Sequence, residues 1–331
     1  MEKNIGAKKS FSLKSVDSLA IVIAMILEVI VFGLSSKYFF TVDNFLTIIQ
    51  YCSITGLVSL PMSLLIISGH FDMSLGSNMA FASCFAAMVL MQSGLTGILG
   101  NIVALLAGMI GGALIGLFNS IFITRAKIIP FIATMAMMQV ARGFAYILTD
   151  GLSIMVSSNL NFIELGRGRF LGIPNTMYLF IIMIAVFWFI SRYTVFGRRA
   201  YIIGGNRIAA RLAGINYEKN VTYLYLILGS VVGLAGALSA AQLGAAIPSS
   251  SASFSFDVIS AVVLGGTSLS GGKGSIGGTV LGVLVLAILN NGLIMLNVST
   301  YWQLVASGMM LLVAVSIDSI KQLRIAKSVR Q

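Results

Sequence analysis

Charged residues are scarce in this chain. Asp, Glu, Lys and Arg make up only 9% of its 331 residues, whereas 58% are hydrophobic. An ordinary soluble domain carries about 25% charged residues, so this composition excludes one. The chain is expected to be an all-α polytopic membrane protein.

Cysteine and histidine are nearly absent as well. Cys52 and Cys84 both lie in apolar runs, and His70 is the only histidine. These counts argue against a disulfide framework and against a metal site. His70, Asp72 and Ser74 alternate on one short segment, where side chains seldom converge as a catalytic triad. We expect no catalysis there, and instead a loop and a helix start at which Asp72 or Ser74 caps free backbone NH groups.

Ten apolar stretches are long enough to cross about 30 Å of hydrocarbon, at about 20 residues each. They are residues 17–34, 45–67, 72–92, 98–123, 128–149, 176–195, 221–243, 255–270, 276–296 and 301–318. Asp257, Gly265 and Gly266 interrupt the eighth, as a broken or re-entrant helix would be interrupted. The expected division is a cytoplasmic segment (1–16), a transmembrane domain (17–318) and a cytoplasmic tail (319–331).

The net charge of +11 comes from 21 basic and 10 acidic residues. Nucleic-acid binding would explain such an excess, but so would basic residues confined to one face of a membrane. With the amino terminus inside, ten spans leave only Lys37, Arg142, Arg167 and Arg169 away from the cytoplasmic face. We therefore expect both termini in the cytoplasm and no nucleic-acid partner. The longest outside loop runs over residues 150–175 and is either a solvated hairpin or a docking site.

Glycines recur every four residues at 108, 112 and 116, and again at 274, 278 and 282. Small residues on one helix face let backbones approach closely in lipid, so both sets are predicted helix-contact seams.

The segment from Gly197 to Lys219 is strongly basic, which places it on the cytoplasmic side. Residues 208–215 read as a short helix, with Asn206 as its N-cap and Gly214 as its stop. A short helix on the inner face suggests docking.

Three segments resemble the permease subunits of ribose-type sugar ATP-binding-cassette importers, a family that includes autoinducer-2 permeases. They are GGNRIAARLAG (204–214), SGHFDMSLG (68–76) and AVVLGGTSLSGGKGSIGG (261–278). The resemblance implies the fold of such a permease, a cytosolic ATPase, an extracytoplasmic binding protein on the outer loop, and a second permease subunit, identical or paralogous. It also implies location in the cytoplasmic (inner) membrane. His70 and Phe71 depart from the family's usual Gly and Ile.

In that family the first segment is similar to the helix that couples the permease to its ATPase. The resemblance therefore implies a coupling role for a set of small and polar residues: Gly204, Gly205, Asn206, Ala209, Ala210 and Gly214.

The glycine-rich stretch from Gly265 to Gly274 fails as a phosphate-binding loop. Thr267 stands where that loop needs Gly, and Gly274 follows Lys273 in place of Ser or Thr. We expect a tight cytoplasmic turn and no bound cofactor, with ATP hydrolysed by the partner subunit.

Polar groups inside the membrane are candidates for a translocation path. The candidates are Asp72, Ser74, Asn119, Gln139, Arg142, Asn290 and Asn291. Helix–helix hydrogen bonds, with Arg142 snorkelling or paired to Asp150, would explain most of them equally. The sequence thus predicts a non-enzymatic permease subunit that moves a ribose-type monosaccharide or related hydroxylated solute. The alternative is a stand-alone secondary transporter or channel, with Glu28 or Arg142 as its coupling residue.

Overall fold

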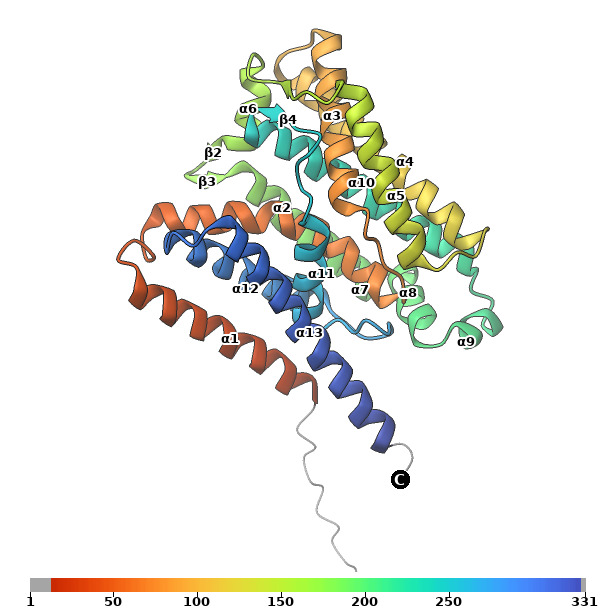
Figure 1. The fold of residues 1–331 in the computed structure, drawn as a ribbon. Coiled ribbons are helices and arrows are strands. Elements are labelled where there is room, and N and C mark those ends of the chain that lie inside the picture. The colour runs from red at the N-terminus through yellow and green to blue at the C-terminus, as the bar shows by residue number, and fades with distance from the viewer. Residues whose placement is uncertain (1–12, 329–331) are drawn as a thin grey trace, which may run out of the picture.

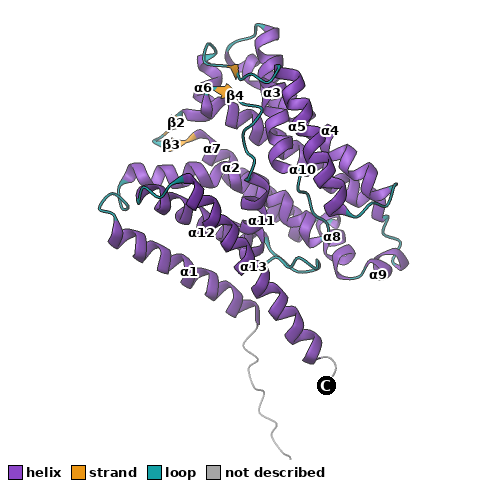
Figure 2. Ribbon diagram, in the orientation of Figure 1, coloured by secondary structure: helices purple, strands orange, loops and turns teal. Residues whose placement is uncertain are grey.

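The computed structural model describes residues 13–328, with side chains for residues 21–320, and these residues are almost entirely helical (Figures 1 and 2). The helices that correspond to the ten expected spans are α1 (Leu13–Ser35), α2 (Val42–Ile67), α3 (Leu75–Ser93), α4 (Gly97–Thr124), α5 (Pro130–Thr149), α7 (Asn175–Tyr193), α10 (Tyr217–Leu243), α11 (Phe254–Leu264), α12 (Ile276–Met295) and α13 (Thr300–Ser328). The connections hold α6 (Leu160–Arg167), α8 (Val195–Gly205) and α9 (Arg207–Leu212), with the two-residue strands β1 (Ile154–Met155), β2 (Arg169–Phe170), β3 (Ile173–Pro174) and β4 (Ala245–Ala246).

Within the described part of the chain, eight helices are long and apolar enough to cross a membrane. The other two counterparts are α1, with an apolar part over Ile21–Ser35, and α11. At 11 residues, α11 rises only about 16 Å, half of the hydrocarbon thickness. The helix ends at Leu264, directly before Gly265 and Gly266, so the eighth span is interrupted at the two predicted glycines, whereas Asp257 lies inside the helix; non-helical residues 244–253 precede it.

The predicted boundaries differ from the structure at the carboxyl end. Helix α13 continues through Ser328, so most of the tail expected from residue 319 extends the last helix. Residues 1–12 of the predicted cytoplasmic segment, and 329–331, lie outside the described part.

The first glycine seam joins α4 to α10. A Cβ atom added at Gly108, Gly112 or Gly116 would collide with backbone oxygens of α10. The backbones therefore touch, which confirms the predicted packing role. In the second set, Gly278 and Gly282 contact the backbone of α11, but Gly274 lies in the loop before α12.

The connections gather at two ends of the molecule, with α9 at one end and α6 beside β4 at the other (Figure 1). At the α6 end, β1 pairs antiparallel with β4, and Val156 donates its backbone NH to Gly244 O at 3.0 Å. Asn101 of α4 donates to Asn161 O of α6 at 3.1 Å. The loop expected at residues 150–175 is therefore folded down onto the ends of α4 and α10.

Candidate functional site

Helix α9 lies in the basic connection between α8 and α10. The side chain of Asn206 accepts from the NH groups of Ile208 and Ala209, both at 3.0 Å, and Gly214 has a φ of 72°. These residues begin and stop the helix as the sequence predicts.

The exposed face of α9 combines large apolar side chains with arginine. Ile208 is 74% exposed and Leu212 is 85% exposed, while Ala209 and Arg211 are exposed beside them. Ala210 is only 1% exposed, so its side chain faces its own chain and not the open side. Two large apolar side chains on a basic loop are typical of a docking surface.

Glycine backbones connect this segment to the end of α2. A Cβ atom at Gly204 would collide with the carbonyl oxygen of Ile67, while the space around Gly205 is open. Gly272 donates its backbone NH to Ile67 O at 2.7 Å. The turn at residues 268–274 is thus in direct backbone contact with the ends of α2 and α8. The glycines of that turn permit this close approach.

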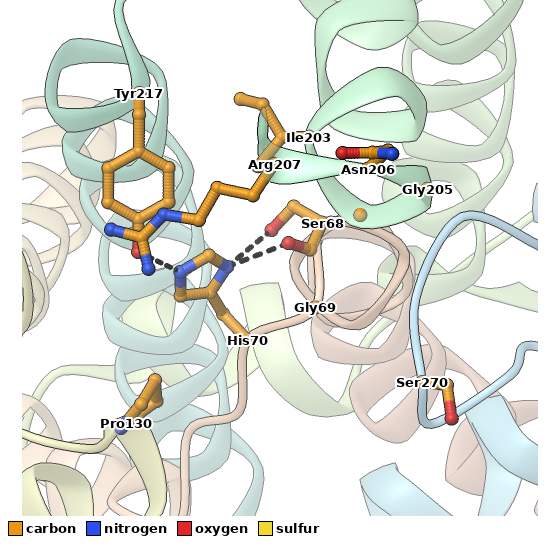
Figure 3. A pocket seen from close by; sticks show the side chains of 11 residues that line it. Ser68, Gly69, His70, Pro130, Ile203, Gly205, Asn206, Arg207, Tyr217 and Ser270 are labelled. Atoms are coloured by element: carbon orange, nitrogen blue, oxygen red, sulfur yellow. Dashed lines mark hydrogen bonds between the residues drawn. The ribbon is translucent and has the colours of Figure 1, made fainter. Parts of the chain in front are cut away.

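A cavity of about 300 Å³ beside this junction contains His70 (Figure 3). Its Nδ1 lies 2.9 Å from Ser68 O, and its Nε2 lies 2.8 Å from the Tyr217 hydroxyl. Because a carbonyl can only accept, Nδ1 carries the proton and Nε2 accepts from Tyr217. Arg207 stacks over the Tyr217 ring, 3.7 Å from its centroid. Burial, with a smaller contribution from Arg207, lowers the pKa of His70 to about 4.

Three of the predicted path residues form one buried cluster where α3 begins. Asp72 Oδ1 accepts from the Ser74 NH at 2.7 Å and from its hydroxyl at 2.5 Å. Asn119 of α4 donates to Asp72 Oδ2 at 3.2 Å and to Ser74 Oγ at 3.0 Å. All three are at most 1% exposed, so their hydrogen bonds stabilise the helix start, and a role in a path stays a prediction. Asp72 caps the backbone as expected, whereas the Ser74 side chain caps no NH group.

Side chains from other helices satisfy the backbone of the non-helical segments. Thr134 Oγ1 accepts from the Met73 NH, the Tyr225 hydroxyl donates to Phe71 O, and Ser255 Oγ donates to Met73 O. Arg142 donates to Ser250 O at 2.8 Å and also to Pro248 O. Irregular backbone at membrane depth needs such partners. Arg142 therefore stabilises the non-helical segment that leads into α11. Its hydrogen bonds run to that backbone, and not to Asp150, which is one of the partners considered from the sequence.

The remaining predicted path residues are dispersed. Gln139 is exposed on α5. Asn290 donates to the Tyr51 hydroxyl at 2.9 Å, and Asn291 donates to Asn44 Oδ1 at 2.8 Å, so both tie α12 to α2. These contacts are helix–helix hydrogen bonds, the reading that the sequence left open.

A second cavity, of about 200 Å³, lies between α2, α3, α10 and α11. Its polar and aromatic lining comprises Gln50, Tyr51, Thr55, Gln242, Phe254 and Asp257. Sequence reasoning noticed only Asp257, as an interruption of the eighth span. The amides of Gln50 and Gln242 inside apolar runs were an equally available signal.

Comparisons with known proteins give the chain its family. Residues 44–315 match the family described as the permease component of branched-chain amino acid transport systems. The chain belongs to this permease family. It is 38% identical to the ribose import permease of Bacillus subtilis over 89% of this chain and 91% of that protein. The Escherichia coli K12 ribose import permease is 36% identical over 91% of this chain and 93% of that protein.

A third relative is the L-arabinose ABC transporter permease of Azospirillum brasilense, 34% identical over 85% of this chain and 83% of its own length. No solved structure matches this permease at a significant level. The matched region begins in α2 and ends in α13, so it contains the basic loop, both cavities and the folded loop above α10.

Proposed function

We propose that this chain is the transmembrane subunit of an ATP-binding-cassette importer for a ribose-type monosaccharide. The observation that carries the proposal is the identity of 34–38% to ribose and arabinose permeases over 85–91% of the chain. The chain would act as a transport subunit and not as an enzyme.

The chemistry of the second cavity favours a sugar over the amino acid in the family's description. Its lining contains one carboxylate and no Lys, Arg or His. An amino-acid substrate brings its own carboxylate, which pairs best with a cationic side chain and which the Asp257 carboxylate would repel. A neutral sugar needs only hydrogen-bond partners.

The proposed assembly has separate parts. A cytosolic ATPase would dock on α9 and hydrolyse ATP, so this chain would bind no cofactor. An extracytoplasmic binding protein would dock on the folded loop at residues 150–175, and a second permease subunit would complete the pathway. Basic residues beside α9 support the cytoplasmic position of this end in an inner membrane.

Leu212→Glu tests the docking of the ATPase. The side chain is 85% exposed, so the fold should tolerate the change, but a carboxylate would replace an apolar contact with the partner. We expect a ten- to hundred-fold loss of ATPase co-purification, about 1.4–2.8 kcal/mol, and a parallel loss of ATP-dependent ribose uptake at equal membrane levels.

The matched control is Leu212→Met, which keeps an apolar side chain of similar size. Ala210→Trp is a poor probe, since Ala210 is buried in its own chain. Wild-type co-purification and uptake in Leu212→Glu would show that α9 does not couple this chain to an ATPase.

A further inference from the structure

The second cavity has the chemistry of a binding site for one neutral monosaccharide. Two side-chain amides both donate and accept, the Asp257 carboxylate accepts at two oxygens, and Phe254 and Tyr51 supply ring surfaces. Ligand sites commonly combine apolar walls with a few placed polar groups. The volume of about 200 Å³ is below the roughly 300–1,000 Å³ of drug-sized ligands and suits a single sugar ring.

The polar side chains of this cavity keep part of their surface accessible to a ligand. Gln50, Tyr51, Gln242 and Asp257 are all half-buried, so their surfaces remain accessible. Among the described residues, the side-chain amide of Gln242 takes part in no hydrogen bond. Asn290 donates to the Tyr51 hydroxyl and thereby holds the Tyr51 side chain in position. The cavity wall therefore holds one side chain already fixed in place, Tyr51, and one amide without a hydrogen-bond partner in the described part of the chain, Gln242.

The broken eighth span creates the cavity. Phe254 and Asp257 occupy the first turn of α11, which begins at this depth because residues 244–253 are not helical. Non-helical backbone inside a membrane is tolerated where it is buried in protein or lines a cavity. Arg142 donates to the carbonyls of Pro248 and Ser250 in this non-helical segment, so its backbone is held by a side chain that does not line the cavity.

Helix α6 connects the cavity to the folded loop above it. Gln50 donates from Nε2 to Gly166 O at 3.5 Å, and Arg167 donates to Leu243 O at 2.7 Å and to Gln242 O. The same eight-residue helix thus contacts both of the helices that contribute an amide to the cavity. A protein that docks on the loop would press on the entrance of this site.

We propose that this cavity is the transient binding site that receives one neutral monosaccharide after its release at the α6 end, with Gln242 and Asp257 as its principal hydrogen-bonding groups. This inference rests on the proposed function. The cavity is lined by none of the path residues that the sequence predicted.

The test measures sugar moved per ATP hydrolysed, using the full transporter with its ATPase and binding protein in proteoliposomes. The probes are ribose, arabinose and allose. Gln242→Leu removes the side-chain amide, and Asp257→Asn removes the charge and replaces one acceptor oxygen by an NH2 donor, both at similar side-chain size. We expect each to lower the sugar moved per ATP by about tenfold and to change the ratio of rates among the three sugars, while ATP hydrolysis stimulated by the binding protein stays near wild type.

Gln92→Leu is the matched control, because Gln92 is an exposed amide near the carboxyl end of α3 and borders neither cavity. Unchanged coupling and unchanged sugar ratios in both cavity variants would overturn the inference and leave the importer assignment standing. A parallel fall of transport and ATP hydrolysis would also overturn it, since the cavity would then serve assembly. If the wild-type transporter moves none of the three sugars, the proposed function itself is wrong.

Discussion

At the scale of single residues, the polar side chains inside this chain mostly serve the backbone. Thr134, Tyr225 and Ser255 each hydrogen-bond to the segment before α3, and Arg142 does the same for the segment before α11. Membrane interiors supply no water to do this. A polar residue in an apolar run is therefore weak evidence for a path until its partner is known.

His70 gives the first prediction at this scale. Its neutral form is satisfied by Ser68 O and the Tyr217 hydroxyl, and Arg207 lies over the same tyrosine ring. Protonation would place a second positive charge near Arg207 in a buried site and would make Nε2 a donor toward the Tyr217 hydroxyl. Because the pKa falls from 6.5 to about 4 on folding, the unfolded state binds the proton first as the pH drops. Stability should be complete above pH 6.5 and fall by about 2 kcal/mol between pH 7 and pH 5.

Thermal unfolding of the detergent-solubilised chain at several pH values measures this slope. His70→Gln is an informative comparison because the chain has no other histidine. Its melting temperature should depend less on pH between 7 and 5, whatever its value at pH 7. Identical slopes in the two proteins would mean that His70 does not titrate as inferred.

At the scale of elements, the glycine pattern predicted close helix contacts and the structure shows which helices meet. Gly112 faces the backbone of α10 at Gly229, and Gly278 faces α11 at Gly265. Spacing alone identifies a face but not its partner, because any helix with small residues could fit it. For the same reason, the sequence predicted α9 and its caps but not the inward direction of Ala210.

The second prediction concerns the seam between α4 and α10. Gly112→Ala would place a methyl group against the backbone of Gly229 and Gly233, which cannot yield as a side chain can. Overpacking of this kind typically costs about 1–3 kcal/mol. We expect a lower melting temperature in detergent and reduced membrane levels.

Gly143→Ala is the control within the neighbouring helix α5, because open space surrounds Gly143. Replacing this helical glycine should be neutral or stabilising by up to about 1 kcal/mol. Equal melting temperatures for the two variants would refute backbone contact at the seam.

At the scale of the whole molecule, the sequence predicted the helices and their order because each is a local apolar run, and eight of them in the described part are long and apolar enough to cross a membrane. It also indicated the interruption of the eighth span at Gly265 and Gly266. The cavity beside Asp257 could not be predicted in the same way. Its walls come from residues near 50, 79, 242 and 254, and only packing decides which faces of four helices meet.

The orientation in the membrane is the third prediction. We expect Arg125→Cys, at the end of α4 nearest the basic loop, to resist impermeant thiol reagents in intact cells, and Ser157→Cys to react. Both positions are exposed, so reactivity reports the side of the membrane. The native Cys52 and Cys84 are buried and should give a low background. Labelling of Arg125→Cys from outside would reverse the orientation inferred from the charges.

The length of α10 has a mechanical consequence. Its first residue, Tyr217, borders the cavity of His70, and Gln242, near its other end, borders the second cavity. The glycine seam packs α10 closely against α4, so the two helices should move as one rigid body. Helix α10 has 27 residues and is about 40 Å long. If α10 tilted by about 5° about its α9 end, the Gln242 end would move by about 3.5 Å. A displacement of that size would change the width of the second cavity and so the space for one sugar ring.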